Sequence, residues 1–139
     1  MDKSYKTAIA RKTLSVPTRM LRDKGLLKGR VLDYGCGRSF DTDHLNIDGY
    51  DPHYSPRWPV GKYDTIICNY VLNVVEGSTQ DDIIYNIRNL LTLGGTAYIT
   101  VRRDIKTEGV TSRGTYQTNV TLSFEILRET SKYCTYIIQ

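Results

Sequence analysis

Residues 63–72, YDTIICNYVL, begin as an almost uninterrupted apolar run. A strand exposed on one face alternates apolar and polar residues, whereas a strand covered on both faces does not. The run therefore predicts a buried strand that ends near Cys68 or Asn69. Strands of this kind belong to parallel sheets with helices packed on both sides.

The segments around this run alternate between strand and helix patterns, which predicts one α/β domain over residues 15–139. A loosely ordered basic segment is expected before it, at residues 1–14. We expect further strands at 30–35, 46–52, 96–103 and 133–139, helices at 16–25, 38–46, 78–95 and 122–131, and a long polar loop at 104–119. Within the helix at 78–95, Ser78 or Thr79 is the expected cap, and Gly94 and Gly95 are expected to end it.

Ligands of such sheets bind beyond the carboxyl ends of the strands. The stretch VLDYGCGRSFD places Gly35 and Gly37 directly after a strand, where a glycine turn lets the backbone approach a ligand closely. A dinucleotide site requires a third glycine at position 40, which is Phe40, so a nicotinamide-dependent oxidoreductase is disfavoured. The acids at positions 33 and 51 suit a cofactor with a sulfonium and an amino acid tail. Asp33 would hold the amino group and Asp51 both ribose hydroxyls; a structural turn with two solvated acids is the alternative.

Three stretches in order, VLDYGCG, YDTIICNYVLNVVE and LLTLGGTAYITV, resemble the motifs of class I S-adenosylmethionine-dependent methyltransferases. The resemblance covers residues 30–103 and implies a minimal Rossmann-like fold with S-adenosylmethionine as cofactor. It places the cofactor against eight residues, Asp33, Gly35, Cys36, Gly37, Asp41, Asp51, Pro52 and Asn69.

A narrower resemblance lies in DYGCGRSFD, GYDPHYSP, NYVLNVVE and RGTYQ, which are similar to the DNA phosphorothioation-associated putative methyltransferases. That family's name reflects gene neighbourhood and implies no substrate. Ser39 and Phe40 stand where its members usually show glycine and an acid. The short link from Asp51 to Tyr63 leaves no room for the usual helix and third strand, so the sheet is expected to be trimmed at one edge. Trp58, in this link, would either stack on the adenine or cover the sheet edge.

Methyl transfer requires mainly alignment and sometimes removal of a proton. The tetrapeptide (Asn/Asp)-Pro-Pro-aromatic of adenine amino-methylation and the Pro-Cys of cytosine methylation are both absent. The catalytic candidates are His53, Asn69 and Tyr70, with His44 and Asp41 as other proton acceptors near the same edge. The substrate-binding candidates are Arg103, Arg113 and Tyr116; Arg102 and Arg103 alternate on a strand, so only one of them should face the pocket.

Charge is uneven along the chain. Residues 1–30 carry nine basic groups against Asp2 and Asp23, a net +7, and the other 109 residues sum to −3, which gives the overall +4. This favours nucleic acid as the methyl acceptor, against the alternative of a solvated basic face. A second alternative is an accessory subunit that binds the cofactor and methylates nothing alone. Three widely spaced cysteines predict neither disulfides nor a metal site, and the lack of long apolar runs predicts a cytoplasmic protein without membrane contact.

Overall fold

The computed structural model describes residues 4–8 and 10–139, and at its centre lies a six-stranded sheet in the order β2-β1-β3-β4-β8-β7. Strands β1 (Val31–Tyr34), β2 (Asp48–Tyr50), β3 (Tyr63–Asn69) and β4 (Leu91–Arg102) pair in parallel. Strands β8 (Tyr133–Ile138) and β7 (Glu125–Glu129) add antiparallel pairs beyond β4. The mostly parallel sheet expected from the sequence is confirmed.

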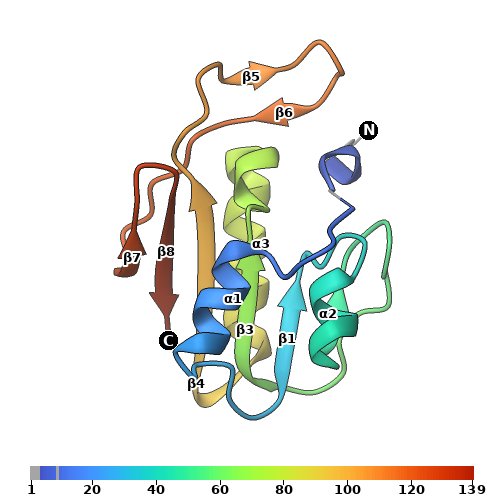
Figure 1. The fold of residues 1–139 in the computed structure, drawn as a ribbon, viewed down its shortest axis with the longest axis vertical. Coiled ribbons are helices and arrows are strands. Elements are labelled where there is room, and N and C mark those ends of the chain that lie inside the picture. The colour runs from blue at the N-terminus through green and yellow to red at the C-terminus, as the bar shows by residue number, and fades with distance from the viewer. Residues whose placement is uncertain (1–3, 9) are drawn as a thin grey trace.

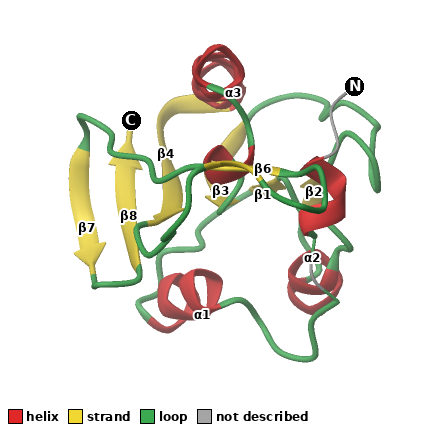
Figure 2. Ribbon diagram, turned by 90° about the horizontal axis from the view of Figure 1, so that it is seen from above, coloured by secondary structure: helices red, strands yellow, loops and turns green. Residues whose placement is uncertain are grey.

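Helices cover both faces of this sheet (Figures 1 and 2). Helices α1 (Val16–Asp23) and α2 (Phe40–Leu45) lie on one face, and α3 (Gly77–Leu90) lies on the other. Strand β3 is buried on both sides, as the sequence predicted. Ile66 packs in the cluster that includes the apolar stripe of α3, and Ile67 packs with Leu21 of α1. Among the described residues, no helix has the length and apolar character needed to cross a membrane.

Strand β2 forms one edge of the sheet, and no helix or strand follows it before β3. The indole of Trp58 lies against this edge, with ring centroids 5.0 Å from Tyr50 and 6.2 Å from Tyr34 in edge-to-face geometry. The trimmed edge therefore carries an aromatic cover in place of the missing strand.

The helix expected at residues 122–131 is absent, and strand β7 occupies this segment. Short apolar segments do not distinguish helix from strand by pattern alone. Here Ile126 pairs with Tyr136, and Thr130 closes the turn by accepting hydrogen bonds from the N–H groups of Lys132 and Tyr133. Pairing with β8 therefore overrides the local helical preference.

Helix α3 ends at Leu90, before the glycines that were expected to end it, and β4 begins at Leu91. Gly94 and Gly95 instead lie inside β4, where the pairing with β3 shifts register between Tyr63 and Thr65. The cap is also different, because Glu76 is the N-cap and no side chain caps the helix. The two glycines therefore mark an irregularity in a strand, a role that glycine often has there.

The polar segment at 104–119 contains a small antiparallel ribbon, β5 (Gly109–Val110) and β6 (Tyr116–Gln117), where the sequence predicted only a loop. Asn73, which is 1% exposed, joins this segment to the sheet. Its Nδ2 donates to the carbonyls of Arg102 (3.1 Å) and Thr118 (2.9 Å), and its Oδ1 accepts from Arg102 N–H (2.7 Å). The ribbon is thus held above the carboxyl ends of β3 and β4 (Figure 1).

We expect Asn73→Ala to lower the free energy of unfolding by about 2–3 kcal/mol, because the change leaves buried backbone groups without partners. Urea denaturation would measure the loss. Asn89→Ala is the matched control, since this side chain is exposed on α3, and we expect a change below about 0.5 kcal/mol. Equal effects of the two substitutions would contradict the structural role assigned to Asn73.

Candidate functional site

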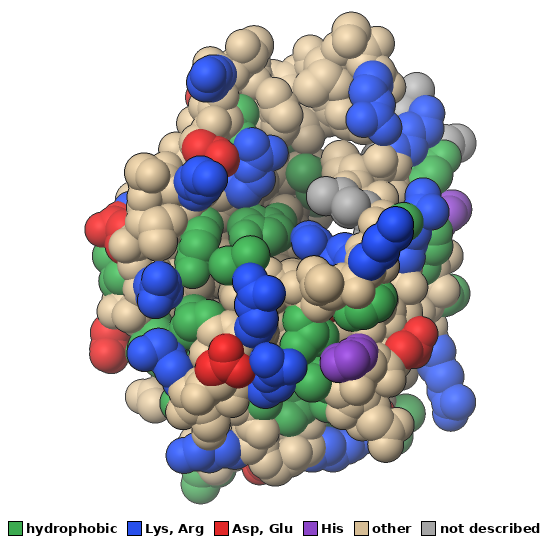
Figure 3. Space-filling model, in the orientation of Figure 1, with side chains coloured by type: hydrophobic (Ala, Val, Ile, Leu, Met, Phe, Trp, Pro, Cys, Tyr) green, Lys and Arg blue, Asp and Glu red, His purple; other side chains and the backbone are tan. Residues whose placement is uncertain are grey.

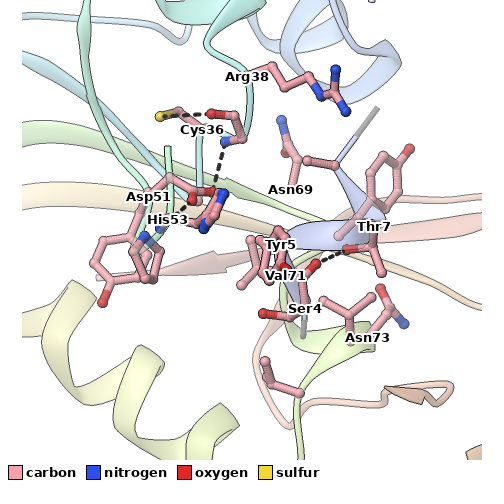
Figure 4. A pocket seen from close by; sticks show the side chains of 18 of the residues that line it. Ser4, Tyr5, Thr7, Cys36, Arg38, Asp51, His53, Asn69, Val71 and Asn73 are labelled. Atoms are coloured by element: carbon pink, nitrogen blue, oxygen red, sulfur yellow. Dashed lines mark hydrogen bonds between the residues drawn. The ribbon is translucent and has the colours of Figure 1, made fainter. Parts of the chain in front are cut away.

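A cavity of about 870 Å³ lies at the carboxyl ends of β1, β2 and β3. Eleven of the fourteen residues predicted for the site line it, namely Asp33, Gly35, Cys36, Gly37, Asp41, Asp51, Pro52, His53, Asn69, Tyr70 and Tyr116. The other three, Trp58, Arg103 and Arg113, are not among the lining residues. Figure 4 shows part of this lining, with Asp51 and His53 beside the glycine loop and Asn69 across from them.

The glycine loop is fixed by β2 and by the segment after β3. The N–H groups of Gly35 and Cys36 both donate to the carbonyl of Tyr50, at 2.7 and 2.9 Å. Gly35 has φ +89°, and a Cβ there would lie 2.3 Å from Cγ2 of Val71. Only glycine therefore lets the loop pass this close to Val71 and keep its backbone turned toward the cavity.

Gly35→Ala is expected to destabilise the fold by about 2–3 kcal/mol, through left-handed backbone strain and overlap with Val71. Gly25→Ala is the matched control, because Gly25 has φ +70° and no atom within 4 Å of an added Cβ. It should cost only the backbone strain, about 1 kcal/mol. Thermal unfolding would give both values. The second substitution Val71→Ala should recover part of the lost stability when it is combined with Gly35→Ala, but not when it is combined with Gly25→Ala.

Ser39, one of the departures from the resembling family, has φ +69° at the N-cap of α2. This left-handed conformation is the one that glycine adopts most easily, so the serine holds a backbone that usually favours glycine. Its Oγ lies 3.3 Å from Oγ of Ser55 and 3.6 Å from Sγ of Cys36. The glycine loop is thereby tied to the loop after β2.

The carboxylate of Asp51 links these two loops more strongly. Its Oδ2 accepts from Gly37 N–H at 3.0 Å, and its Oδ1 accepts from His53 and Tyr54 N–H at 2.9 and 3.0 Å. Backbone donors hold the side chain at the wall of the cavity. A carboxylate has further lone pairs, so Asp51 retains the capacity to accept hydrogen bonds from a ligand.

Asp33 is 4% exposed at the end of β1. Within residues 4–8 and 10–139, no group donates a hydrogen bond to its carboxylate. Burial, together with the charges of Asp41 and Asp51, raises the pKa of Asp33 to about 8, and Arg11 opposes this shift. A buried carboxyl group without a hydrogen-bond donor costs free energy of folding unless a ligand pairs with it. Asp33 is therefore a candidate contact for a cationic group.

Asp41 lines the cavity but is already engaged by the chain. Its Oδ2 accepts from Ser15 Oγ at 2.6 Å and its Oδ1 from Ser15 N–H at 3.1 Å. Nδ2 of Asn69 donates to Oγ1 of Thr18 at 2.8 Å, in the same buried network. Oδ1 of Asn69 is buried, and no group in the described part of the chain donates to it.

The catalytic candidates Tyr70 and His53 lie on different elements. Tyr70 follows β3 with φ +64°, a conformation that is rare outside glycine and that clusters at functional sites. Its N–H donates to the carbonyl of Thr100 at 2.8 Å, and burial raises the pKa of its phenol. The exposed ring of His53 stacks on Tyr5, with centroids 4.0 Å apart.

Of the two alternating arginines, the structure brings Arg102 to the cavity and not Arg103, which the sequence had favoured. Arg103 points to the other face of β4, where it donates to the hydroxyl of Tyr136 at 2.6 Å and forms an ion pair with Glu129. Arg113 donates to the carbonyl of Lys6 at 3.5 Å. The alternation correctly predicted that one of the two arginines faces the cavity, but that residue is Arg102 and not Arg103.

The sequence did not indicate that the N-terminal segment contributes to the cavity. Residues 4–7 form the 3₁₀-helix η1 (Ser4–Thr7), and five lining residues come from the described part of this segment, Ser4, Tyr5, Thr7, Ala8 and Arg11. The hydroxyl of Tyr54 donates to the carbonyl of Tyr5 at 3.4 Å. Asp2 and Lys3, which belong to the predicted basic segment, lie outside the described residues. In the sequence, only the net positive charge of this segment indicated a functional role.

Several solved structures share this fold. "DhpI-SAM-HEP complex" matches with a TM-score of 0.64 and 12% identity, over 87% of this chain and 83% of that one. The magnesium protoporphyrin IX methyltransferase ChlM of Synechocystis PCC 6803 with bound SAH matches with a TM-score of 0.54 and 15% identity, over 98% and 93% of the two chains. The glycopeptide N-methyltransferase MtfA complexed with S-adenosyl-L-homocysteine matches with a TM-score of 0.50 and 11% identity, over 99% and 74%.

These likenesses place the chain in the Rossmann-like methyltransferase fold expected from the sequence. No protein-family model matches the chain. No curated protein sequence matches it significantly.

Proposed function

We propose that this protein binds S-adenosylmethionine and transfers its methyl group to an acceptor. The observation that carries the proposal is the pair of acids around the glycine loop, in which buried Asp33 lacks a donor among the described residues and Asp51 is held by backbone N–H groups. An ammonium group suits the first and two ribose hydroxyls suit the second. The fold shared with methyltransferases supports the same assignment.

The residues of the cavity divide into groups under this proposal. The backbone of Gly35, Cys36 and Gly37 passes beneath the cofactor, and Asp51 with Pro52 lies beside the ribose. Asp41 acts through Ser15, which it fixes, and so holds the beginning of α1 against the glycine loop. Trp58, packed on the sheet edge at Tyr50, covers that edge and is not assigned to the adenine.

When bound, the cofactor supplies a methyl group on a sulfonium: the acceptor's lone pair forms the new bond to carbon, and the electrons of the broken carbon–sulfur bond stay on sulfur. The protein aligns the acceptor and accepts any proton it loses. Tyr70 is the candidate for positioning, because its strained backbone fixes it at the cavity. His53 is the candidate proton acceptor, and Asn69, whose buried Oδ1 has no donor in the described part of the chain, also lines the cavity.

Calorimetry with S-adenosylmethionine and S-adenosylhomocysteine tests the cofactor assignment. We expect one-to-one binding with an affinity in the micromolar range, which is typical of enzyme ligands. NADH, the cofactor of the disfavoured oxidoreductase reading, should not bind. Absence of binding by both sulfur compounds at saturating concentrations would overturn the proposed function.

The nature of the acceptor is a separate proposal. The positive charge of residues 1–30 favours nucleic acid, and exposed Lys12 and Lys24 are available for it. Part of that charge is already neutralised, since Arg22 pairs with Asp23 and Arg30 with Asp48. Oligonucleotide affinity should fall steeply with salt if this acceptor is correct. Cofactor binding without methyl transfer to any pool would favour the accessory-subunit alternative.

We also propose, on the four stretches quoted above, the narrower relationship to the DNA phosphorothioation-associated putative methyltransferases. That relationship names no acceptor, so the biochemical tests do not depend on it.

A further inference from the structure

Two arginines line the cavity and act electrostatically on the same tyrosine, Tyr70. Arg11 comes from the N-terminal segment and Arg102 from the end of β4, and both line the cavity. Both positive charges lower the pKa of the Tyr70 phenol, which burial raises. Residues from the N-terminal segment and from the end of β4 thus both contribute to the wall of the cavity.

Neither guanidinium is saturated by the protein. Arg11 is partly buried, and within residues 4–8 and 10–139 it has no hydrogen-bond or ion-pair partner. Arg102 uses only Nε, which donates to Oδ1 of Asp104 at 2.9 Å, so its two terminal nitrogens have no partner in the described part of the chain. Planar guanidinium groups bind carboxylate and phosphoryl oxygens bidentately, and these donors remain available for such a ligand.

The N-terminal segment restricts the size of what can reach these arginines. Tyr5 stacks on His53 at one side of the opening, and Ser15 is bound to Asp41 at the other end of the segment. Between them, the side chain of Ala8 approaches Gly37, with its Cβ 3.4 Å from the position of an added Cβ. Figure 3, drawn in the orientation of Figure 1, shows a hollow in the upper part of the molecule with blue Lys and Arg atoms at its border.

The cavity volume of about 870 Å³ is in the range of pockets for small ligands, about 300–1,000 Å³. It has room for a nucleoside cofactor and one small second molecule, and the segment over its mouth obstructs the approach of a polymer. Arg11 and Arg102 line this space, whereas Arg19 and Lys24 are exposed on the α1 side and are not among the lining residues.

We propose that the methyl acceptor is a small molecule carrying a carboxylate or phosphoryl group, which Arg11 and Arg102 bind beside Tyr70. This rests on the proposed methyltransferase function and names a substrate class for it, in place of the nucleic acid that the charge of residues 1–30 favours. The anionic group anchors the acceptor and need not be the atom that is methylated. Tyr116, which also lines the cavity, borders the same region from strand β6.

The first test uses protein saturated with S-adenosylhomocysteine, titrated with inorganic phosphate and, separately, with malonate. NMR shifts or thermal unfolding would report the affinity, and comparison of the two anions distinguishes a phosphoryl from a carboxylate ligand. We expect at least one anion to bind, with Arg102→Gln weakening it about tenfold. Arg11→Gln should have a similar effect, but Arg102→Gln is the cleaner variant because Arg11 also acts on Asp33.

Arg19→Gln is the matched control, since it removes the same charge from an exposed position outside the cavity. It should leave anion affinity unchanged. If S-adenosylhomocysteine binds and neither anion does, or if Arg19→Gln weakens the anion as much as Arg102→Gln, the subsite is overturned and the proposed function stands. If S-adenosylhomocysteine itself fails to bind, the proposed function is overturned together with this inference.

The second test follows a radiolabelled methyl group from S-adenosylmethionine into cell extract that is then divided into low-mass and nucleic-acid fractions. We expect label in the anionic low-mass fraction, reduced by Arg102→Gln and retained in Arg19→Gln. Label in DNA or RNA instead would overturn the inference in favour of the nucleic-acid acceptor.

Discussion

Replacing Asp51 with alanine is expected to weaken binding of S-adenosylmethionine by about a hundredfold or more. Two hydrogen bonds from ribose hydroxyls to a charged carboxylate would be lost, each worth about 1.5–3 kcal/mol. The carboxylate of Asp51 also accepts hydrogen bonds from the N–H groups of Gly37, His53 and Tyr54. The substitution removes these bonds, so the loops that form the cavity wall would lose their common anchor.

Calorimetry would measure this loss, and circular dichroism would verify that the fold is intact. Asp43→Ala is the matched control, because this exposed acid of α2 removes the same charge near the glycine loop without lining the cavity. Its affinity should stay within about twofold of the unchanged protein. A hundredfold loss in both variants would mean that charge alone, and not the position of Asp51, controls binding.

The part of the cavity that we propose for the cofactor could be predicted from the sequence because its residues follow strands at short, fixed distances. Asp33, Gly35 and Gly37 come with β1, Asp51 follows β2, and Asn69 ends β3. Parallel strands bring their carboxyl ends to one edge of the sheet, so local pattern is sufficient to place these side chains together.

The part that we propose for the acceptor could not be predicted in the same way, because it depends on contacts between distant segments. Whether Arg102 or Arg103 faces the cavity is decided by the register of β4 with β8, where Arg102 pairs with Tyr133. Arg11 lies on a segment that is anchored by contacts with distant residues, such as that of Ser15 with Asp41, 26 positions further along the chain. Neither contact leaves a periodic signal in the sequence.

The same limit explains two of the errors in the C-terminal half. Strand β7 was taken for a helix because five residues cannot show which period they follow, and its identity comes from the pairing of Ile126 with Tyr136. Gly94 and Gly95 signalled an interruption correctly, but the interruption lies inside β4 and not at the end of α3. The glycines in the sequence thus identified where regular structure is interrupted, and the pairing of β4 with β3 determined what that interruption is.

A second large effect is expected from Asp33, for which pH should act in opposite directions on stability and on cofactor binding. Burial and the neighbouring acids raise the pKa of Asp33 from its usual value of 3.8 to about 8 in the folded protein. Between these values the unfolded chain ionises this group and the folded chain keeps it protonated. The contribution of Asp33 to the free energy of unfolding therefore falls as pH rises, by up to about 1.4 kcal/mol per unit.

Asp33→Asn removes this dependence, so the variant should become increasingly more stable than the unchanged protein between pH 5 and 8. Urea denaturation across this range would measure the difference. Asp81→Asn, an exposed acid on α3, is the matched control and should give a difference that is nearly independent of pH. A constant difference for Asp33→Asn as well would contradict the protonated state of the buried carboxyl group.

Cofactor affinity should change with the opposite sign, because an ammonium group requires the ionised carboxylate. Up to tenfold tighter binding per pH unit is expected from pH 6 to 8, and a proton should be released on binding, which calorimetry in buffers of different ionisation enthalpy would detect. Asp33→Asn should bind the cofactor weakly over the whole range. Since a purely structural acid would alter stability alone, opposite pH trends in stability and affinity, both lost in Asp33→Asn, would identify Asp33 as the residue that holds the amino group.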